Sequence, residues 1–489
     1  MELPIEEIHN FWKKIVGEPQ KVNIGEELKE WSRSMKAQRD QESTVVRMEA
    51  KEWKELLAKI KPWKAAGPDG IQAYWWKTMK VAKRRLEDWC TRALRKEKQL
   101  IPQWFCRGRV VLIPKKGKES KEPGDYRPIT CLNTCYKILT GMMATLMMKQ
   151  VEGQLAPEQL ALKKGLSGCM HAHILDQATI RDAQRRNREL HMLWIDMTKA
   201  YDSVAHKSLR WILKRWGINP LILRLLNKVM KNQKVRYFGK YQGNLVKSEM
   251  LAIKNGLLQG DALSPLLFVL AITPISYWLR EKVRAYEIVI KGSQDSPLKV
   301  GHIFYMDDLK VYTCNWNELV RAKNGIEKVA EQIGLKLNAR KCAIKSMNYR
   351  QGELRGGVRE VGQIPILGST DCYRYLGIEQ NALMNIGQLW TRTEDACLEA
   401  AQEILRSDAT AGQKINSYNT EVMPKVRYAA TCIIFGEGRF NSLRRRANEL
   451  DAKVRALMTE YKIRFRGNCR ARLYIDVQDG GLGVKAAEE

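Results

Sequence analysis

Three aspartates in two short segments place the strongest constraint on how this chain can fold. Asp196 directly follows the apolar run 192–195, a pattern typical of a buried strand with a charged residue at its end. Asp307 and Asp308 lie within 300–312, where two β-rich runs flank a short acidic segment, so we expect a hairpin with both aspartates at its tip. One such aspartate alone would be an ordinary turn residue. The three together predict a strand end and a hairpin tip that meet.

Carboxylates arranged in this way suit a two-metal site of phosphoryl transfer. Two divalent ions about 3.5–4 Å apart need several carboxylates converging on them, and Mg²⁺ prefers hard oxygen ligands. We therefore predict that Asp196, Asp307 and Asp308 bind two Mg²⁺ ions, with Mn²⁺ as the alternative metal. Asp202, which follows in the segment of Asp196, is expected to serve structure, for example as a helix cap.

The composition favours a folded protein that binds nucleic acid. The 489 residues are enough for two to four domains with buried cores, and 44% hydrophobic with 28% charged residues is typical of a globular chain. The net charge of +30 indicates a polyanionic partner. A membrane surface is the alternative, but no lipidation motif supports it. The apolar stretch 262–279 contains Pro265 and Pro274 and is better explained as a buried helix than as a membrane span.

The cysteines and the N-terminus give no sign of secretion. The eleven cysteines include no Cys-x-x-Cys pair, which argues against a zinc finger. The first residues lack the basic start and apolar core of a signal peptide. We therefore expect reduced thiols in a reducing compartment.

Two segments carry cations that suit a triphosphate. Lys115 and Lys116 follow a strand predicted over 109–114, and Arg127 stands next to Pro128 in a turn. Arginine binds phosphate in a bidentate way. We predict that Lys115 and Arg127 contact the nucleotide; for each lysine, a solvated loop is an equally good alternative.

Further candidates lie in the segments between and after the aspartates. Tyr201, one helical turn beyond Asp196, would lie beside whatever the metals hold and could block a ribose 2′-hydroxyl; a packed core tyrosine is the alternative. Gly260 lets the backbone approach a ligand closely, and Gln259 can hydrogen-bond a sugar or base. Lys341 is a candidate general acid for a pyrophosphate leaving group, against the alternative of a surface lysine.

Six sequence motifs occur in one order over roughly 250 residues, and such an ordered set is far more specific than any single motif. The six motifs are Arg127–Ile129, Ile195–Asp202, Gln259–Pro265, Tyr305–Asp308, Gly334–Lys341 and Tyr373–Gly377. They resemble the successive reverse-transcriptase motifs of non-LTR retrotransposons. The segment 67–70 is similar to the fingers-side signature of the same elements. The tail 472–483 is similar to elements of the Dong-like kind, which carry a restriction-enzyme-like endonuclease.

The resemblance implies an α+β fold, a right-hand polymerase with fingers, palm and a helical thumb. Residues 1–60 would form a helical N-terminal extension, and residues 61–190 the fingers. Residues 191–380 would form the palm with the catalytic aspartates. Residues 381–489 would form a helical, basic thumb and the start of a C-terminal linker.

The resemblance also implies an RNA-directed DNA polymerase whose partners are an RNA template, a DNA primer or target, and dNTPs. It puts Asp196, Asp307 and Asp308 on the metals, Arg127 on the triphosphate and Tyr201 at the sugar. Gln259 and Gly260 would line the nucleotide pocket. Action in the nucleus is implied, with the cytoplasm as the alternative. The residues that would grip the primer are Tyr373, Tyr375, Leu376 and Gly377.

The chain departs from the family pattern in two ways. The chain stops shortly after Gly483, where relatives continue into an endonuclease region, and it lacks the zinc fingers that many carry at the front, so we expect a truncated copy or a fragment of a longer product.

Two rival functions are open. An RNA-dependent RNA polymerase would use the same chemistry, but Tyr201 argues against it. A catalytically idle nucleic-acid-binding protein is the second rival, against which the three intact aspartates argue. The sequence does not indicate an oligomeric state.

Overall fold

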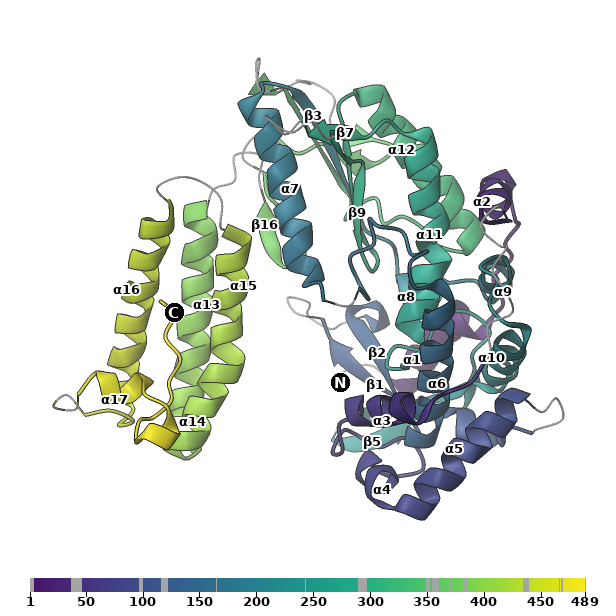
Figure 1. Ribbon diagram of the computed structural model, residues 1–489, viewed down its shortest axis with the longest axis horizontal. Coiled ribbons are helices and arrows are strands. Elements are labelled where there is room, and N and C mark those ends of the chain that lie inside the picture. The colour runs from purple at the N-terminus through teal and green to yellow at the C-terminus, as the bar shows by residue number, and fades with distance from the viewer. Residues whose placement is uncertain are drawn as a thin grey trace.

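The computed structural model describes the chain from residue 4 to residue 488, with gaps at 37–45, 96–99, 116–121, 164, 242, 289–296, 349–351, 354–359, 369–370, 381–385, 434–438, 466 and 468. The described part combines helices with two five-stranded sheets, so the predicted α+β class is confirmed. A large body holds both sheets, and a helical bundle near the C-terminus stands beside it (Figure 1).

The first sheet joins segments that are far apart in the sequence. Its order is β2-β1-β4-β5, with β6 also paired to β4. β1 runs antiparallel to β2 but parallel to β4. Residues assigned above to the fingers and to the palm therefore share one sheet. The strands are β1 Arg107–Pro114, β2 Tyr126–Leu132, β4 Lys234–Tyr241, β5 Asn244–Lys247 and β6 Leu251–Ala252.

The second sheet has the order β12-β11-β3-β10-β9 and places β3 at its centre. β3 is buried from Leu190 to Ile195, which confirms the predicted buried strand before Asp196. β9 and β10 pair antiparallel, which confirms the predicted hairpin. The strands are β3 Glu189–Ile195, β9 His302–Tyr305, β10 Asp308–Thr313, β11 Ala343–Asn348 and β12 Gly352–Glu353.

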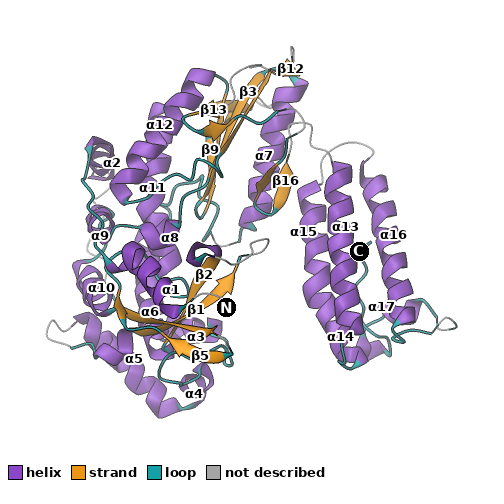
Figure 2. Ribbon diagram, turned by 180° about the vertical axis from the view of Figure 1, so that it is seen from behind, coloured by secondary structure: helices purple, strands orange, loops and turns teal. Residues whose placement is uncertain are grey.

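Helices cover both faces of the second sheet (Figure 2). Successive strand residues point to opposite faces, and the odd-numbered Leu193 and Ile195 join the core formed with α11 and α12, whereas Met192 and Trp194 join the core on the side of α7. This double cover explains why β3 reads as a continuous apolar run rather than an alternating one. The helices are α7 Gly168–Arg185, α11 Ser264–Lys282 and α12 Trp316–Ile333.

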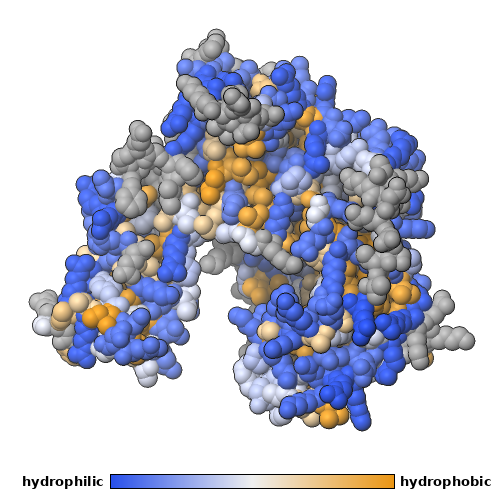
Figure 3. Space-filling view, in the orientation of Figure 1, coloured by the Kyte–Doolittle hydropathy of each residue, from blue (hydrophilic) through white to orange (hydrophobic). Residues whose placement is uncertain are grey.

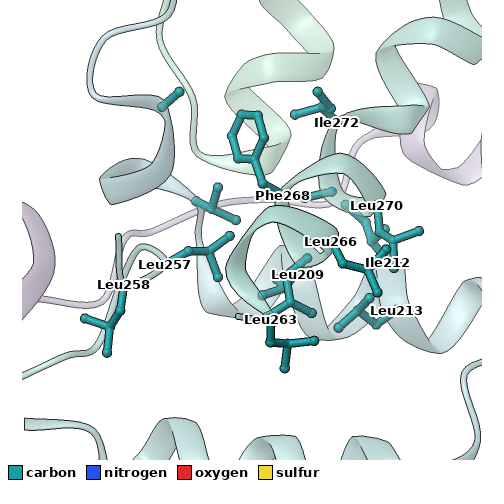
Figure 4. Packing of buried hydrophobic residues seen from close by; sticks show 14 of the residues in the cluster. Leu209, Ile212, Leu213, Leu257, Leu258, Leu263, Leu266, Phe268, Leu270 and Ile272 are labelled. Atoms are coloured by element: carbon teal, nitrogen blue, oxygen red, sulfur yellow. The ribbon is translucent and has the colours of Figure 1, made fainter. Parts of the chain in front are cut away.

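The apolar stretch around α11 is a buried helix, as predicted. Its side chains pack against α9 and the segment before α11, where Leu266, Phe268 and Leu270 lie among leucines and isoleucines (Figure 4). Each such side chain contributes roughly 1.5–3 kcal/mol through burial. Within the described residues, no helix has the length and apolar character needed to cross a lipid bilayer.

The N-terminal helices pack into the same core as the sheets. Trp12 stacks on Tyr237 of β4, with ring centroids 6.3 Å apart and an interplanar angle of 15°. The remaining helices of the large body are α1 Ile5–Trp12, α2 Glu26–Lys36, α3 Ala50–Lys59, α4 Ala73–Thr78, α5 Lys80–Arg95, α6 Thr134–Val151, α8 Ala200–Ser203, α9 His206–Arg215 and α10 Pro220–Asn232. Its short hairpins are β7 Tyr286–Ile288 with β8 Leu298–Val300, β13 Glu360–Val361 with β14 Ile364–Pro365, and β15 Tyr373–Tyr375 with β16 Ile378–Gln380.

The C-terminal bundle has a hydrophobic core of its own, separate from that of the large body. A broad hollow separates the two bodies on the face shown in Figure 3, and the surface on both sides of it is largely hydrophilic. The helices of the bundle are α13 Ile386–Arg406, α14 Ala411–Ser417, α15 Met423–Ile433, α16 Arg439–Glu460 and α17 Ala471–Tyr474.

Candidate active site

Strand register brings two of the three predicted metal-binding aspartates together. β10 pairs antiparallel with β3, with Leu309 opposite Ile195. Continuing this register by one residue sets Asp308 across from Asp196. Directly opposite residues of an antiparallel pair have Cβ atoms about 4.5–5.5 Å apart. The pairing of the two strands therefore builds the acidic site.

The tight turn between β9 and β10 adds the third aspartate. Asp308 pairs with Tyr305, so only Met306 and Asp307 form the turn. Met306 has a φ of 54°, a left-handed conformation that is unfavourable for a residue with a large side chain. Gln159 holds it there, because its side chain accepts from the Met306 amide at 3.1 Å and donates to the Met306 carbonyl at 3.4 Å.

Burial and mutual repulsion raise the pKa values of these carboxyl groups. The pKa of Asp308 rises to about 6, through burial first and then through the charges of Asp307 and Asp196. Burial also raises the pKa of Asp307, with Asp196 adding to the effect, and burial raises that of Asp196. The described residues contain no ready-made cluster of three or more metal-ligating side chains. A divalent cation would nevertheless relieve the repulsion, so this all-oxygen donor set fits Mg²⁺.

A cavity of about 670 Å³ lies in front of the aspartates. It gathers residues of strand β2, residues that flank the strands of the second sheet, and the bend before α11, which the sequence places far apart. Asp308 is at the edge of the acidic site and outside this lining. Predicted site residues that line the cavity are Lys115, Arg127, Asp196, Tyr201, Gln259, Gly260, Asp307 and Lys341.

Cations face the carboxylates across the cavity. The Lys341 Nζ atom lies 3.9 Å from Asp196 Oδ2. Lys115 is fixed at the end of β1, where its Nζ donates to the Gly124 carbonyl at 2.7 Å. Burial lowers the pKa of Lys115, and the charges of Lys341, Lys199 and Arg127 lower it further. These four cations are thus close enough to repel one another, and an anion between them would be stabilised. Lys116 lies outside the described residues.

Lys199 is a site residue that the sequence interpretation missed. It lines the cavity and has a left-handed φ of 46°. Its Nζ lies 4.3 Å from the ring centroid of Phe11 and 5.7 Å from that of Trp12, so the N-terminal helix α1 helps to hold it. Its position inside the motif Ile195–Asp202 could have identified Lys199 from the sequence. Its contact with α1 could not, because no sequence pattern links the two segments.

Tyr201 stands between the two acidic segments. Its ring stacks on Phe268 of α11, with centroids 4.6 Å apart and an interplanar angle of 10°. Its hydroxyl lies 3.7 Å from Met306 Sδ. Burial and the charge of Asp307 raise the pKa of Tyr201 to about 12. The Tyr201 side chain is therefore fixed, uncharged and next to the Met306–Asp307 turn.

The bend before α11 approaches β2 and α8 closely. Gly260 has a φ of 113°, and a Cβ atom there would lie 2.5 Å from the Thr130 carbonyl oxygen. Gln259 donates its side-chain amide to Asp202. Asp202 lies inside α8, whose N-cap is Lys199, so the expectation of a helix cap for Asp202 is wrong. Its carboxylate belongs to the cavity lining instead.

The predicted primer-grip residues form the hairpin β15–β16. Its turn uses two left-handed residues, Leu376 with a φ of 45° and Gly377 with a φ of 84°. Tyr373 stacks on Trp194, and its hydroxyl donates to the Lys341 carbonyl at 2.8 Å. Tyr375 is only 3% exposed, so its side chain supports the hairpin from inside and does not face solvent.

Comparison with known proteins shows which family this chain resembles. Residues 113–380, over half of the chain, match the family described as reverse transcriptase (RNA-dependent DNA polymerase). A retrovirus-related Pol polyprotein from the type-1 retrotransposable element R2 of Nasonia vitripennis is 27% identical over 333 residues, which cover 65% of this chain and 30% of that protein. Its counterpart from Popillia japonica is 23% identical over 450 residues, which cover 88% and 57%.

Telomerase from Candida albicans, solved in complex with a fragment of telomeric RNA, aligns with a TM-score of 0.37 and 13% identity, covering 81% of this chain and 65% of that one. The chain spans between 30% and 57% of the length of the two R2 polyproteins. The match over 113–380 includes all three aspartates and the cations Arg127 and Lys341. By this match, the chain belongs to the reverse transcriptase family.

Proposed function

We propose that this chain is the RNA-directed DNA polymerase of a non-LTR retrotransposon, which joins dNTPs to a primer 3′-hydroxyl under the direction of an RNA template. One observation carries the proposal: Asp196 and Asp307 share a cavity with the cations Lys115, Arg127 and Lys341. Carboxylates on one side and phosphate-binding cations on the other are what nucleotidyl transfer needs. The R2 elements to which the chain is similar support the retrotransposon origin.

Asp196, Asp307 and Asp308 would hold the catalytic Mg²⁺ ions. The chemistry that bound Mg²⁺ supplies at such a site is a lowered pKa of the attacking hydroxyl and neutralisation of phosphate charge. The chain's own contribution is positional, since the β3–β10 register and the Met306 turn fix the three carboxylates before any substrate arrives. Fixed charges of this kind act without reorganising during the reaction.

The cations would orient the triphosphate and assist its departure. Arg127 is exposed at the cavity and offers bidentate contacts to phosphate oxygens. Lys115 and Lys199 add positive charge deeper in the cavity. Lys341, close to Asp196, is placed to protonate the pyrophosphate as it leaves.

The cavity wall would select the nucleotide and the hairpin would hold the primer. Tyr201, held flat against Phe268, would collide with a ribose 2′-hydroxyl and so favour deoxynucleotides. Gln259 and Gly260 would line the nucleotide pocket. Leu376 and Gly377 form the tip of β15–β16, which would contact the primer backbone.

The decisive experiment is primer extension on an RNA template with dNTPs and Mg²⁺. Wild type should extend the primer, whereas Asp307→Asn should lose extension while keeping its affinity for template RNA. Asp88→Asn, on the exposed face of α5, is the matched control and should extend normally. Extension by Asp307→Asn at the wild-type rate would refute the assignment.

A catalytically idle nucleic-acid-binding protein is the second candidate, favoured only by the net charge of +30. It predicts RNA binding without extension by the wild type. Both candidates predict that binding weakens steeply with salt, by about 0.7 in log–log slope for each single-strand phosphate neutralised. Efficient use of rNTPs by the wild type would instead favour an RNA-dependent RNA polymerase.

Two finer assignments rest on sequence resemblance. We place the chain with the Dong-like elements because of the tail 472–483, and we propose that it acts in the nucleus, where a DNA target is found. A fluorescent fusion that stays in the cytoplasm would contradict the second assignment. A sequence tree that groups the chain with R2 elements would contradict the first.

A further inference from the structure

A fully buried ion pair joins helix α7 to the hairpin β9–β10, which carries Asp307 and Asp308. Lys310 on β10 pairs with Asp176 on α7, and both side chains are 0% exposed. Lys310 is two residues beyond Asp308 on the same strand, so the two side chains point to the same face of the sheet. Burying two charges is costly, and an apolar pair of similar volume would pack at least as well. Stabilisation of the fold therefore does not explain why a buried ion pair is present at this position.

The carboxylate of Asp176 also anchors the base of the hairpin β15–β16. Gln380, the last residue of β16, donates to Asp176 Oδ2 at 2.6 Å and accepts from Lys310 Nζ at 3.1 Å. Tyr312 donates its hydroxyl to Asp176 Oδ1 at 2.8 Å. Each member of this buried network has a partner, so the position of Gln380 is closely determined.

The other strand of the hairpin is tied to the same lysine. Tyr373 is opposite Gln380 in the hairpin register. The Tyr373 ring stacks on Trp194, with centroids 5.0 Å apart, and Lys310 Nζ lies 4.3 Å from the centroid of the Trp194 ring. Both ends of the hairpin base are thus fixed relative to β10.

The tip of the hairpin is held by the C-terminal bundle. Tyr428 on α15 donates its hydroxyl to the Leu376 carbonyl at 2.5 Å. The same hydroxyl lies 3.2 Å from His173 Nε2. His173 and Asp176 are neighbours on α7, and His173 Nδ1 is 3.4 Å from the Gln380 amide nitrogen. One connected network therefore runs from the catalytic strand to the bundle.

We infer that Lys310, Asp176 and Gln380 are positioning residues that fix the hairpin β15–β16 relative to Asp308, and that Tyr428 couples the hairpin tip to the C-terminal bundle. This inference rests on the proposed polymerase function. The network sets where the primer 3′-hydroxyl stands relative to the catalytic carboxylates. None of Lys310, Asp176, Gln380 and Tyr428 lines the nucleotide cavity, so these residues act on the primer and not on the dNTP.

The test uses variants that leave the buried charges paired. Gln380→Leu releases the hairpin base but keeps the contacts of Asp176 with Lys310 and Tyr312. Tyr428→Phe releases the tip and keeps its ring. Tyr286→Phe is the matched control, because it also removes a hydroxyl bonded to an α7 aspartate, Asp182, yet does not touch the hairpin.

In steady-state extension, Gln380→Leu and Tyr428→Phe should lower kcat by about tenfold or more, as expected for a misplaced reacting group. The KM for dNTP should stay within twofold of the wild-type value. The melting temperature should stay within a few degrees of that of wild type. Tyr286→Phe should match the wild type in kcat. A purely structural role would lower the melting temperature and leave kcat unchanged below it, and that result would overturn the inference.

Photocrosslinking gives a readout that does not need turnover. A primer ending in 4-thiothymidine should crosslink to wild type through its 3′ end, and several-fold less to Gln380→Leu at equal primer occupancy. Equal crosslinking by both would overturn the inference even if the wild type extends primers. An inactive wild type with a crosslink that depends on Gln380 would refute the polymerase function but keep the positioning role.

The double variant Lys310→Met/Asp176→Leu tests the ion pair itself. Replacing both charges by apolar side chains should preserve folding. Because the Tyr312 hydroxyl and the Gln380 amide lose their acceptor, we expect a melting temperature below that of wild type. At temperatures where the double variant is folded, it should show the same loss of kcat as Gln380→Leu. A folded double variant with wild-type kcat would contradict the inference.

Discussion

The side-chain amide of Gln259 donates to both carboxylate oxygens of Asp202, at 3.3 Å and 3.1 Å. Both residues line the cavity in front of Asp196 and Asp307. Burial raises the pKa of Asp202 to about 7, against the opposing influence of Gln259 and Lys199. Near neutral pH the wall of this cavity therefore contains a carboxyl group that gains and loses a proton.

This relationship predicts a pH-dependent stability. The folded-state pKa of Asp202 is raised, so the group favours the folded state below about pH 4, and this contribution is lost as pH rises towards 7. The full cost of burying the charge is on the order of 4 kcal/mol above pH 7. Asp202→Asn carries no charge and should raise the melting temperature more at pH 8 than at pH 5. An equal change at both pH values would contradict the assigned cause.

Metal binding should stabilise the fold through the aspartates. Asp196, Asp307 and Asp308 repel one another, and a divalent ion that binds only the folded state adds about 1–3 kcal/mol at 10 to 100 times its dissociation constant. Mg²⁺ should therefore raise the melting temperature of wild type, and less so that of Asp307→Asn. Thermal scans with MgCl₂ and with KCl at matched ionic strength measure the effect. A shift of the same size in both proteins would place Mg²⁺ elsewhere.

The ring of Tyr201 should control the choice of sugar. Tyr201→Ala removes the ring that stacks on Phe268 and opens space at the sugar, so rNTP use relative to dNTP should rise about 10- to 100-fold. Tyr201→Phe keeps the ring and loses only the contact of the hydroxyl with Met306, so it should still reject rNTPs. Single-nucleotide incorporation measures both. Continued rejection by Tyr201→Ala would put the gate at another residue.

Gly260 should tolerate no side chain. Its φ of 113° is strained for any other residue, and a Cβ atom would meet the Thr130 carbonyl oxygen at 2.5 Å. Gly260→Ala should lower the free energy of unfolding by about 1–3 kcal/mol and reduce extension. Gly412→Ala, in α14 with open space around the site, is the control and should raise it by about 0.5–1 kcal/mol. Urea denaturation compares them; equal effects would refute the steric argument.

Local patterns were enough to predict the elements that carry the aspartates. The apolar run before Asp196 and the β-rich runs around Asp307 each depend on neighbouring residues only, and both elements are present. The parallel pairing of β1 with β4 could not be predicted in this way, because nothing in 107–114 identifies 234–241 as its partner. The left-handed backbone conformation of Met306 could not be predicted either, since methionine is not a residue that marks such a turn.

The candidate site shows the same division. Single residues with chemical character, such as Arg127 and Lys341, were named from the sequence and line the cavity. Residues that act through distant partners were not: Lys199 depends on a helix from the N-terminus, and Asp202 depends on Gln259. The network around Lys310 went unnoticed because a lysine within a strand normally signals a solvent-facing position.

The stacking of Trp12 on Tyr237 has a consequence for how the protein is made. A ribosome adds about 5–20 residues per second, so helix α1 waits roughly 10 s or more before the strand that receives it has been synthesised. During that interval Trp12, on the apolar face of α1, lacks its stacking partner on β4. Helix α1 is thus synthesised well before β4 but can complete this stacking only afterwards, and cellular chaperones have a defined target in the nascent chain.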